Sequence, residues 1–137
     1  MPFIVWNDRL SVGVTAMDRE HKELIAILNS LYDAIRAGAA HDSMSETLER
    51  LDEYTHFHFT HEEALFAQSA YPDAEKHCLE HANTLAWLAE VRRKYDKGTA
   101  AGLSLEIVNY LKDWLFDHIL GSDQKYTPWL HAEGICR

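Results

Sequence analysis

Two pairs of side chains, each four residues apart, carry the chemistry that this sequence suggests. His58 and Glu62 form the first pair, and His77 and His81 form the second. On an α-helix of about 3.6 residues per turn this spacing leaves two side chains about 40° apart, so each pair points one way. A break at residues 71–73 lets the two helices run antiparallel as neighbours. Three imidazoles and a carboxylate at one depth predict a metal site.

Two other predicted helices contribute further donors. His21 lies near the start of an earlier helix and His118 near the end of a later one, so an up-down bundle brings both to the same end. Asp123 is the weakest candidate, because five residues beyond His118 it points about 140° away on a regular helix. It converges only if the backbone bulges, and Gly121 favours such a bulge. The predicted metal ligands are His21, His58, Glu62, His77, His81, His118 and Asp123.

The composition of this donor set favours two metal ions. Five imidazoles and two carboxylates without a thiolate select a first-row transition metal and are too many for one ion. Two ions have about twelve coordination positions, and these donors with one bridging oxygen fill about eleven. The vacancy suits a small molecule bound end-on. The alternative is a set of hydrogen-bonded core histidines, but an empty cluster buries polar groups without partners, at ~1–3 kcal/mol each.

Four segments with helical apolar spacing must position these side chains. They predict an all-α fold, an up-down-up-down antiparallel four-helix bundle with an irregular N-terminal arm. We divide the single domain into an arm (residues 1–17), a bundle (18–121) and a tail (122–137) whose structure the sequence leaves open. The first helix is expected to begin at Asp18, and the second opens with a capping-box pattern at residues 43–46.

Three further helix boundaries follow from residues typical of helix ends. Gly38 and Gly98 are expected to end the first and third helices, and Ser104 is expected to cap the start of the fourth.

Composition limits the class of protein. The 137 residues suffice for one domain with its own core, and a net charge of −9 disfavours nucleic acid and anionic lipid as partners. No apolar run reaches the ~18 residues of a membrane span. The two cysteines form no disulfide framework and the N-terminus lacks a signal pattern, so we expect a cytoplasmic protein. The remaining histidines are assigned no ligand role: His41, His56, His61 and His131.

These residues resemble the hemerythrin family over nearly the full chain. The resemblance rests on a lone histidine, HxxxE, HxxxH and HxxxxD, all present without a gap. It implies a non-haem di-iron centre with an oxo or hydroxo bridge. It assigns three histidines to one iron (His77, His81 and His118), two to the other (His21 and His58), and bridging roles to Glu62 and Asp123. Glu20 stands where many relatives have glutamine, and whether Glu20 or His61 reaches the site is left open.

The resemblance further implies reversible dioxygen binding, for carriage, storage or delivery, at the open position of the two-histidine iron. This reading makes the chain a binding protein and not an enzyme. A di-iron enzyme that consumes O₂, peroxide or nitric oxide is the second hypothesis, an oxygen or iron sensor the third, and a metal-free bundle the last. We expect a monomer, with an oxygen-consuming enzyme as one candidate recipient. The loaded metal stays open, because manganese or zinc accepts similar donors.

Overall fold

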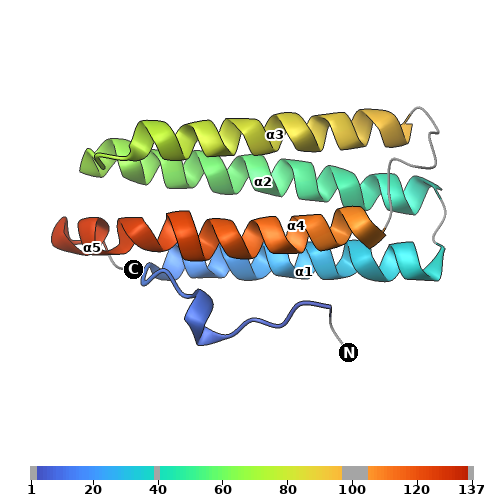
Figure 1. Ribbon diagram of the computed structural model, residues 1–137, viewed down its shortest axis with the longest axis horizontal. Helices are drawn as coiled ribbons and strands as arrows, with labels where there is room; N and C mark the ends of the chain where they lie inside the picture. Colours follow the sequence, from blue (N-terminus) through green and yellow to red (C-terminus); the bar gives the residue numbers. More distant parts are fainter. Residues whose placement is uncertain (1–2, 39–40, 97–104, 136–137) are drawn as a thin grey trace.

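The computed structural model describes residues 3–38, 41–96 and 105–135. Four antiparallel helices run along one axis (Figure 1): α1 (Thr15–Ala37), α2 (His41–Ser69), α3 (Ala74–Asp96) and α4 (Leu105–His118). The described residues contain no strand. The predicted all-α four-helix bundle is therefore confirmed. None of the helices in the described ranges is long and apolar enough to cross a membrane.

The first helix begins earlier than predicted and ends where predicted. Helix α1 begins at Thr15, and Asp18 lies in its first turn. The Asp18 carboxylate accepts hydrogen bonds from the Val12 amide (2.8 Å) and the Ser11 hydroxyl (2.5 Å), so it binds the arm instead of starting the helix. Gly38 adopts the left-handed conformation (φ 63°, ψ 42°) at the C-terminus, as its position predicted.

The second helix also begins before its predicted start. Helix α2 begins at His41, and Ser43 lies inside the helix, where its carbonyl accepts a hydrogen bond from the Thr47 hydroxyl at 3.1 Å. The predicted capping box is therefore wrong as a helix start. Helix α2 ends at Ser69, followed by Ala70 in the left-handed region (φ 54°). Two predicted boundary residues, Gly98 and Ser104, lie outside the described residues.

The chain after α4 forms a short helix that closes one end of the bundle. A π-helical turn η3 (Ile119–Asp123) leads into α5 (Gln124–Ala132), a segment whose structure the sequence left open. Tyr126 and Leu130 of α5 are fully buried. The indole N–H of Trp129 donates a hydrogen bond to the Ser69 carbonyl at 2.8 Å. Helix α5 is therefore anchored to the end of α2.

The N-terminal arm packs against α1 and α5. It contains one 3₁₀ turn η1 (Asp8–Leu10), and Ile4 exchanges two hydrogen bonds with the Asn29 side chain of α1. Helix α5 donates to the arm's backbone, from Thr127 to the Val12 carbonyl (2.6 Å) and from His131 to the Gly13 carbonyl (2.7 Å). These contacts hold the arm and α5 together beside the bundle.

Gly13 should tolerate no side chain at this contact. Its φ is +70°, and an added Cβ would lie 2.9 Å from the His131 ring, so Gly13→Ala should destabilise the fold by ~2–3 kcal/mol. Gly38→Ala is the matched control, because Gly38 has a similar φ of +63° with nothing within 4 Å of the added atom. The Gly38→Ala variant should lose only ~1 kcal/mol of its free energy of unfolding. Denaturant unfolding measures both, and equal losses would contradict a steric role for His131.

Candidate metal centre

Side chains from α1, α2, α3 and the end of α4 meet at one end of the bundle. This is the end where α1 and α3 begin and α2 and α4 end (Figure 1). The cluster contains all seven residues singled out in the sequence: His21, His58, Glu62, His77, His81, His118 and Asp123. His118 is the most exposed of them, at 6%, and four of them are fully buried. A cluster of nitrogen and oxygen donor atoms therefore lies buried in the core.

One part of the cluster gathers three imidazoles around two carboxylate oxygens. His77 Nε2 lies 3.0 Å from Glu62 Oε1 and 2.9 Å from Asp123 Oδ1. His81 Nε2 lies 2.9 Å from the same Glu62 oxygen, and His118 Nε2 lies 3.0 Å from the same Asp123 oxygen. One ligand atom from each of these five residues lies within 4.8 Å of all the others.

The other part gathers two imidazoles around the remaining carboxylate oxygens. His21 Nε2 lies 3.0 Å from Asp123 Oδ2, and His58 Nε2 lies 3.7 Å from Glu62 Oε2. This second group, with Glu62 and Asp123, also fits within 4.8 Å. Each carboxylate therefore presents one oxygen to the group of three histidines and the other oxygen to the group of two.

The short contacts within the cluster are not satisfied hydrogen bonds. Eight buried nitrogen and oxygen atoms of the cluster have no hydrogen-bond partner within the described residues, and seven of them are the atoms in the contacts of 2.9–3.0 Å. Leaving buried groups unpaired costs about 1–3 kcal/mol each. Neighbouring donors around an octahedral ion with bonds of ~2.1 Å also lie ~3.0 Å apart. The residues present therefore fit a pair of metal ions.

A change in helix geometry brings Asp123 into the cluster. His118 ends the regular part of α4, and residues 119–123 form the π-helical turn. A π-helix pairs residues five apart, so it returns Asp123 to the face of His118. The predicted loosening of the backbone is confirmed. Gly121, inside the turn, has nothing within 4 Å of a hypothetical Cβ.

Glu20 reaches the site, which answers a question that the sequence left open. The His58 Nδ1–H donates to Glu20 Oε1 at 2.7 Å, and the His61 Nδ1–H donates to Glu20 Oε2 at 2.5 Å. A carboxylate that accepts from one ring nitrogen fixes the tautomer, so Nε2 of His58 is the free donor toward the cluster. His61 therefore stands one contact away from the cluster, and its side chain is 39% exposed.

Two further carboxylates support the histidines of the next helices, and sequence reasoning missed both. The His81 Nδ1–H donates to Glu63 at 2.8 Å, and the His118 Nδ1 lies 3.5 Å from Glu80, which also accepts from the Ser122 hydroxyl at 2.7 Å. Together with Glu20 they follow one pattern. Each acid is adjacent in sequence to one cluster residue and contacts a cluster histidine on the following helix. Glu20 of α1 contacts His58 of α2, Glu63 of α2 contacts His81 of α3, and Glu80 of α3 contacts His118 of α4.

Removing the Glu20 carboxylate should weaken metal binding. Glu20→Ala should lower iron affinity ~10–100-fold, and Glu20→Gln should lower it less, because the amide oxygen can still accept from His58. Competition against a chromogenic ferrous chelator measures the change. Glu23→Gln is the matched control, since Glu23 lies on the same helix but makes an exposed ion pair with Arg50 at 3.2 Å. Unchanged iron retention in Glu20→Ala would contradict the supporting role.

Aromatic rings and a tyrosine close the site. Phe59 stacks on His81 (ring centroids 3.8 Å, 4° apart in plane), and Trp114 stacks on His118 (5.0 Å, 11°). The Tyr126 hydroxyl of α5 donates to Glu62 Oε2 at 2.9 Å. The tail therefore contributes directly to the cluster, although no metal-ligand spacing in the sequence points to Tyr126.

The charge states of the metal-free cluster follow from the same contacts. Burial alone would lower the pKa of His77, but the Asp123 and Glu62 carboxylates beside it raise that pKa to about 9. Burial alone would raise the pKa of Asp123 and of Glu62, but the surrounding histidines hold both carboxyls well below their usual range. At neutral pH these shifts favour a protonated His77 beside ionised carboxylates, and metal binding must displace that proton.

The other histidines lie away from the cluster where their side chains are described. The His56 side chain is 58% exposed on α2, and His131 bonds the Gly13 carbonyl. The side chain of His41 lies outside the described residues. The fold and the cluster together define a helical bundle that encloses a carboxylate-linked pair of histidine groups suited to two metal ions.

Comparison with known proteins identifies the family. The hemerythrin HHE cation binding domain matches residues 12–130. A bacteriohemerythrin of Ralstonia nicotianae is 34% identical over 134 residues, which cover 98% of this chain and 93% of that protein. A myohemerythrin of Theromyzon tessulatum is 32% identical over 121 residues, 88% of each chain. A crystal structure of wild-type hemerythrin superposes with a TM-score of 0.88 at 26% identity, covering 93% of this chain and 98% of that one.

The chain belongs to the hemerythrin family. The cofactor of that family is a non-haem di-iron centre, and the buried cluster is suited to a metal pair.

Proposed function

We propose that this protein binds dioxygen reversibly at a di-iron centre, for carriage, storage or delivery. The observation that supports the proposal most is the division of the two carboxylates between the two histidine groups. Glu62 and Asp123 each direct one oxygen toward each group, which is the arrangement that two bridging ligands require. A site for a single ion would gather all donors around one point.

The proposed ligand assignment follows the two groups. His77, His81 and His118 would hold one iron, and His21 and His58 the other, with Glu62 and Asp123 bridging. When bound, the iron pair supplies an open coordination position and one electron from each ion, which reversible dioxygen binding needs. The group with two histidines has fewer protein donors, so the open position would fall on the ion that this group holds.

The protein's own residues supply restraint and a dry environment. Glu20 fixes the orientation of His58, and Tyr126 fixes Glu62 through its hydroxyl. Phe59, Ile119 and Met17 are buried at this end of the bundle and help exclude water. The donors are five neutral imidazoles and two carboxylates, a nitrogen-rich set that stabilises high-valent iron less than a carboxylate-rich one. We therefore propose that the site holds oxygen and returns it unchanged.

We further propose that the protein is a monomer in the cytoplasm and that an oxygen-consuming enzyme receives the oxygen it releases. A reducing compartment agrees with the free thiol of Cys78 and with the low cysteine content. Gel filtration tests the monomer, and oxygen transfer to a purified terminal oxidase tests delivery.

Repeated optical cycling tests the proposed function. The iron-loaded protein is reduced without oxygen, exposed to oxygen, and returned to vacuum several times. We expect a visible absorption band that appears and disappears in each cycle, with one O₂ taken up per iron pair. The His56→Ala variant should cycle identically, because His56 lies on the surface.

The same experiment separates the rival functions. A single conversion that vacuum does not reverse, together with hydrogen peroxide release or loss of an added substrate, would contradict carriage and favour an enzyme. A band that cycles while the protein's hydrodynamic radius changes would favour a sensor. Absence of any band in protein that contains two irons per chain would contradict dioxygen binding itself.

A further inference from the structure

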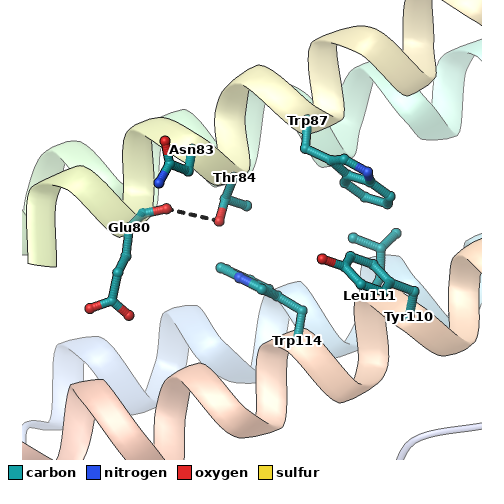
Figure 2. Close-up of a pocket in the computed structure, with 7 residues that line it drawn as sticks. All are labelled: Glu80, Asn83, Thr84, Trp87, Tyr110, Leu111 and Trp114. Atoms are coloured by element: carbon teal, nitrogen blue, oxygen red, sulfur yellow. Dashed lines mark hydrogen bonds between the residues drawn. The ribbon is translucent and has the colours of Figure 1, made fainter.

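A groove between α3 and α4 is lined by three aromatic side chains that the metal cluster does not require for ligation. Trp87 projects from α3, Tyr110 and Trp114 project from α4, and their rings border the space between the two helices (Figure 2). Its volume is about 370 Å³, within the usual range of small-molecule sites. We call this space the aromatic groove.

Two of the three rings of the groove pair with each other, and the third packs against the metal cluster. Trp87 and Tyr110 form one wall, with centroids 4.9 Å apart and planes inclined by 43°. Tyr110 is 55% exposed, so its ring is accessible from solvent. Trp114 lies along the opposite side, where it also stacks on His118. Leu111 closes the floor.

The polar groups at the groove are all acidic or neutral. Glu80 lies at one end of the groove. A second cavity of about 280 Å³ shares Glu80, Tyr110 and Trp114 and adds Asp113, Asp117, Ser122 and the cluster histidine His118. No lysine or arginine is among the described residues that line either cavity. The Thr84 hydroxyl already donates its hydrogen bond to the Glu80 backbone carbonyl at 3.0 Å (Figure 2). Its proton is therefore not available to a ligand in the groove.

Aromatic faces combined with carboxylates favour a cation. A positive charge within ~6 Å of a tryptophan or tyrosine face gains about 0.5–2 kcal/mol from each ring, and the carboxylates add long-range attraction. An anion would be repelled by Glu80, Asp113 and Asp117 and by the chain's net charge of −9. We propose that the aromatic groove binds a small organic cation, an alkylammonium or quaternary ammonium compound with an apolar body.

The two groove residues whose variants test the proposal, Trp87 and Tyr110, lie apart from the metal cluster. No ring contact joins Trp87 or Tyr110 to a histidine of the cluster in the described structure. Trp114 and Glu80 touch both regions, since Trp114 stacks on His118 and the Glu80 carboxylate lies 3.5 Å from His118 Nδ1. Failure of the cation proposal therefore leaves the proposed di-iron function untouched, and the reverse also holds.

Two isosteric probes test the proposal on the full-length, iron-loaded protein. Calorimetric titration compares (2-hydroxyethyl)trimethylammonium with 3,3-dimethylbutan-1-ol, which replaces the charged nitrogen by carbon. We expect one saturable site that binds the cation at least ~10-fold more tightly than the alcohol. Equal affinity for both probes, or no saturable binding of the cation, would overturn the proposal.

Variants locate the site and separate it from general surface charge. Trp87→Leu and Tyr110→Leu should each weaken cation binding at least ~5-fold, whereas Tyr110→Phe should retain it, since the ring and not the hydroxyl attracts the charge. Phe57→Leu, which removes an aromatic ring 57% exposed on α2, should change nothing. Wild-type affinity in Trp87→Leu and Tyr110→Leu would place the cation elsewhere and overturn the assignment.

A third arm distinguishes a free molecule from a protein segment. A short peptide that carries trimethyl-lysine presents the same charged group on a chain. We expect it to bind no more tightly than the free cation, because the groove's volume suits a compact ligand. Peptide binding ~10-fold or more tighter than the free cation would overturn the proposal of a small ligand and indicate a partner protein.

Discussion

Replacing His77 with alanine should remove the iron pair and destabilise the fold. His77 is the one histidine within 3.0 Å of both Glu62 and Asp123 in the described cluster. Its loss leaves both buried carboxylates with fewer compensating partners. Removing one partner of a buried charge lowers the free energy of unfolding by about 3–5 kcal/mol. Iron affinity should fall by more than the ~10–100-fold typical of an outer supporting residue. Elemental analysis and chemical unfolding measure the two effects.

A surface histidine supplies the control for His77→Ala. His56 is 58% exposed on α2 and lies 3.7 Å from Asp52, outside the cluster. His56→Ala should leave iron content unchanged and shift stability by no more than ~0.5 kcal/mol. Full iron occupancy in His77→Ala, or iron loss in His56→Ala, would show that the ligand assignment is wrong.

Metal removal should lower the thermal unfolding midpoint by ~8–20 °C. A ligand present at about a thousand times its dissociation constant stabilises the folded state by about 4 kcal/mol, and in a domain of this size each kcal/mol is worth roughly 2–5 °C. The eight unpaired buried atoms of the metal-free cluster give the structural reason for this dependence. Scanning calorimetry before chelation, after chelation, and after ferrous iron is restored measures the effect. Identical midpoints with and without metal would contradict a structural role for the ions.

The sequence predicted the bundle and the convergence of the cluster for one physical reason. Helical spacing is local, so the pairs at 58 and 62 and at 77 and 81 identify a shared face without knowledge of tertiary structure. Antiparallel connectivity then fixes which helix ends meet. Even Asp123, which regular geometry places on the wrong side of α4, could be included because Gly121 indicated a bulge, and a π-helical turn is present there.

The supporting carboxylates could not be predicted from such spacing. Glu20, Glu63 and Glu80 each lie next to a cluster residue in sequence, so each points about 100° away from it on its own helix. Whether such a side chain meets solvent or a neighbouring helix depends on how the helices are rotated against each other. Glu20 and Glu63 meet neighbouring helices, where they accept hydrogen bonds from the Nδ1–H groups of His58 and His81.

Helix α5 was unpredictable for a different reason. Pro128 removes a backbone donor and opposes a helix interior, so local propensity argues against the element. Tertiary contacts overcome that preference, since Tyr126 and Leu130 are fully buried and Trp129 bonds the end of α2. The hydroxyl that restrains Glu62 therefore comes from a segment that the sequence left unassigned.

A titration of the metal-free protein with ferrous iron, in the absence of oxygen, tests the central claim most directly. The division of Glu62 and Asp123 between two histidine groups predicts that binding saturates at two ions per chain. Saturation at one ion, or no tight binding at all, would contradict the bridged pair and the oxygen chemistry that depends on it.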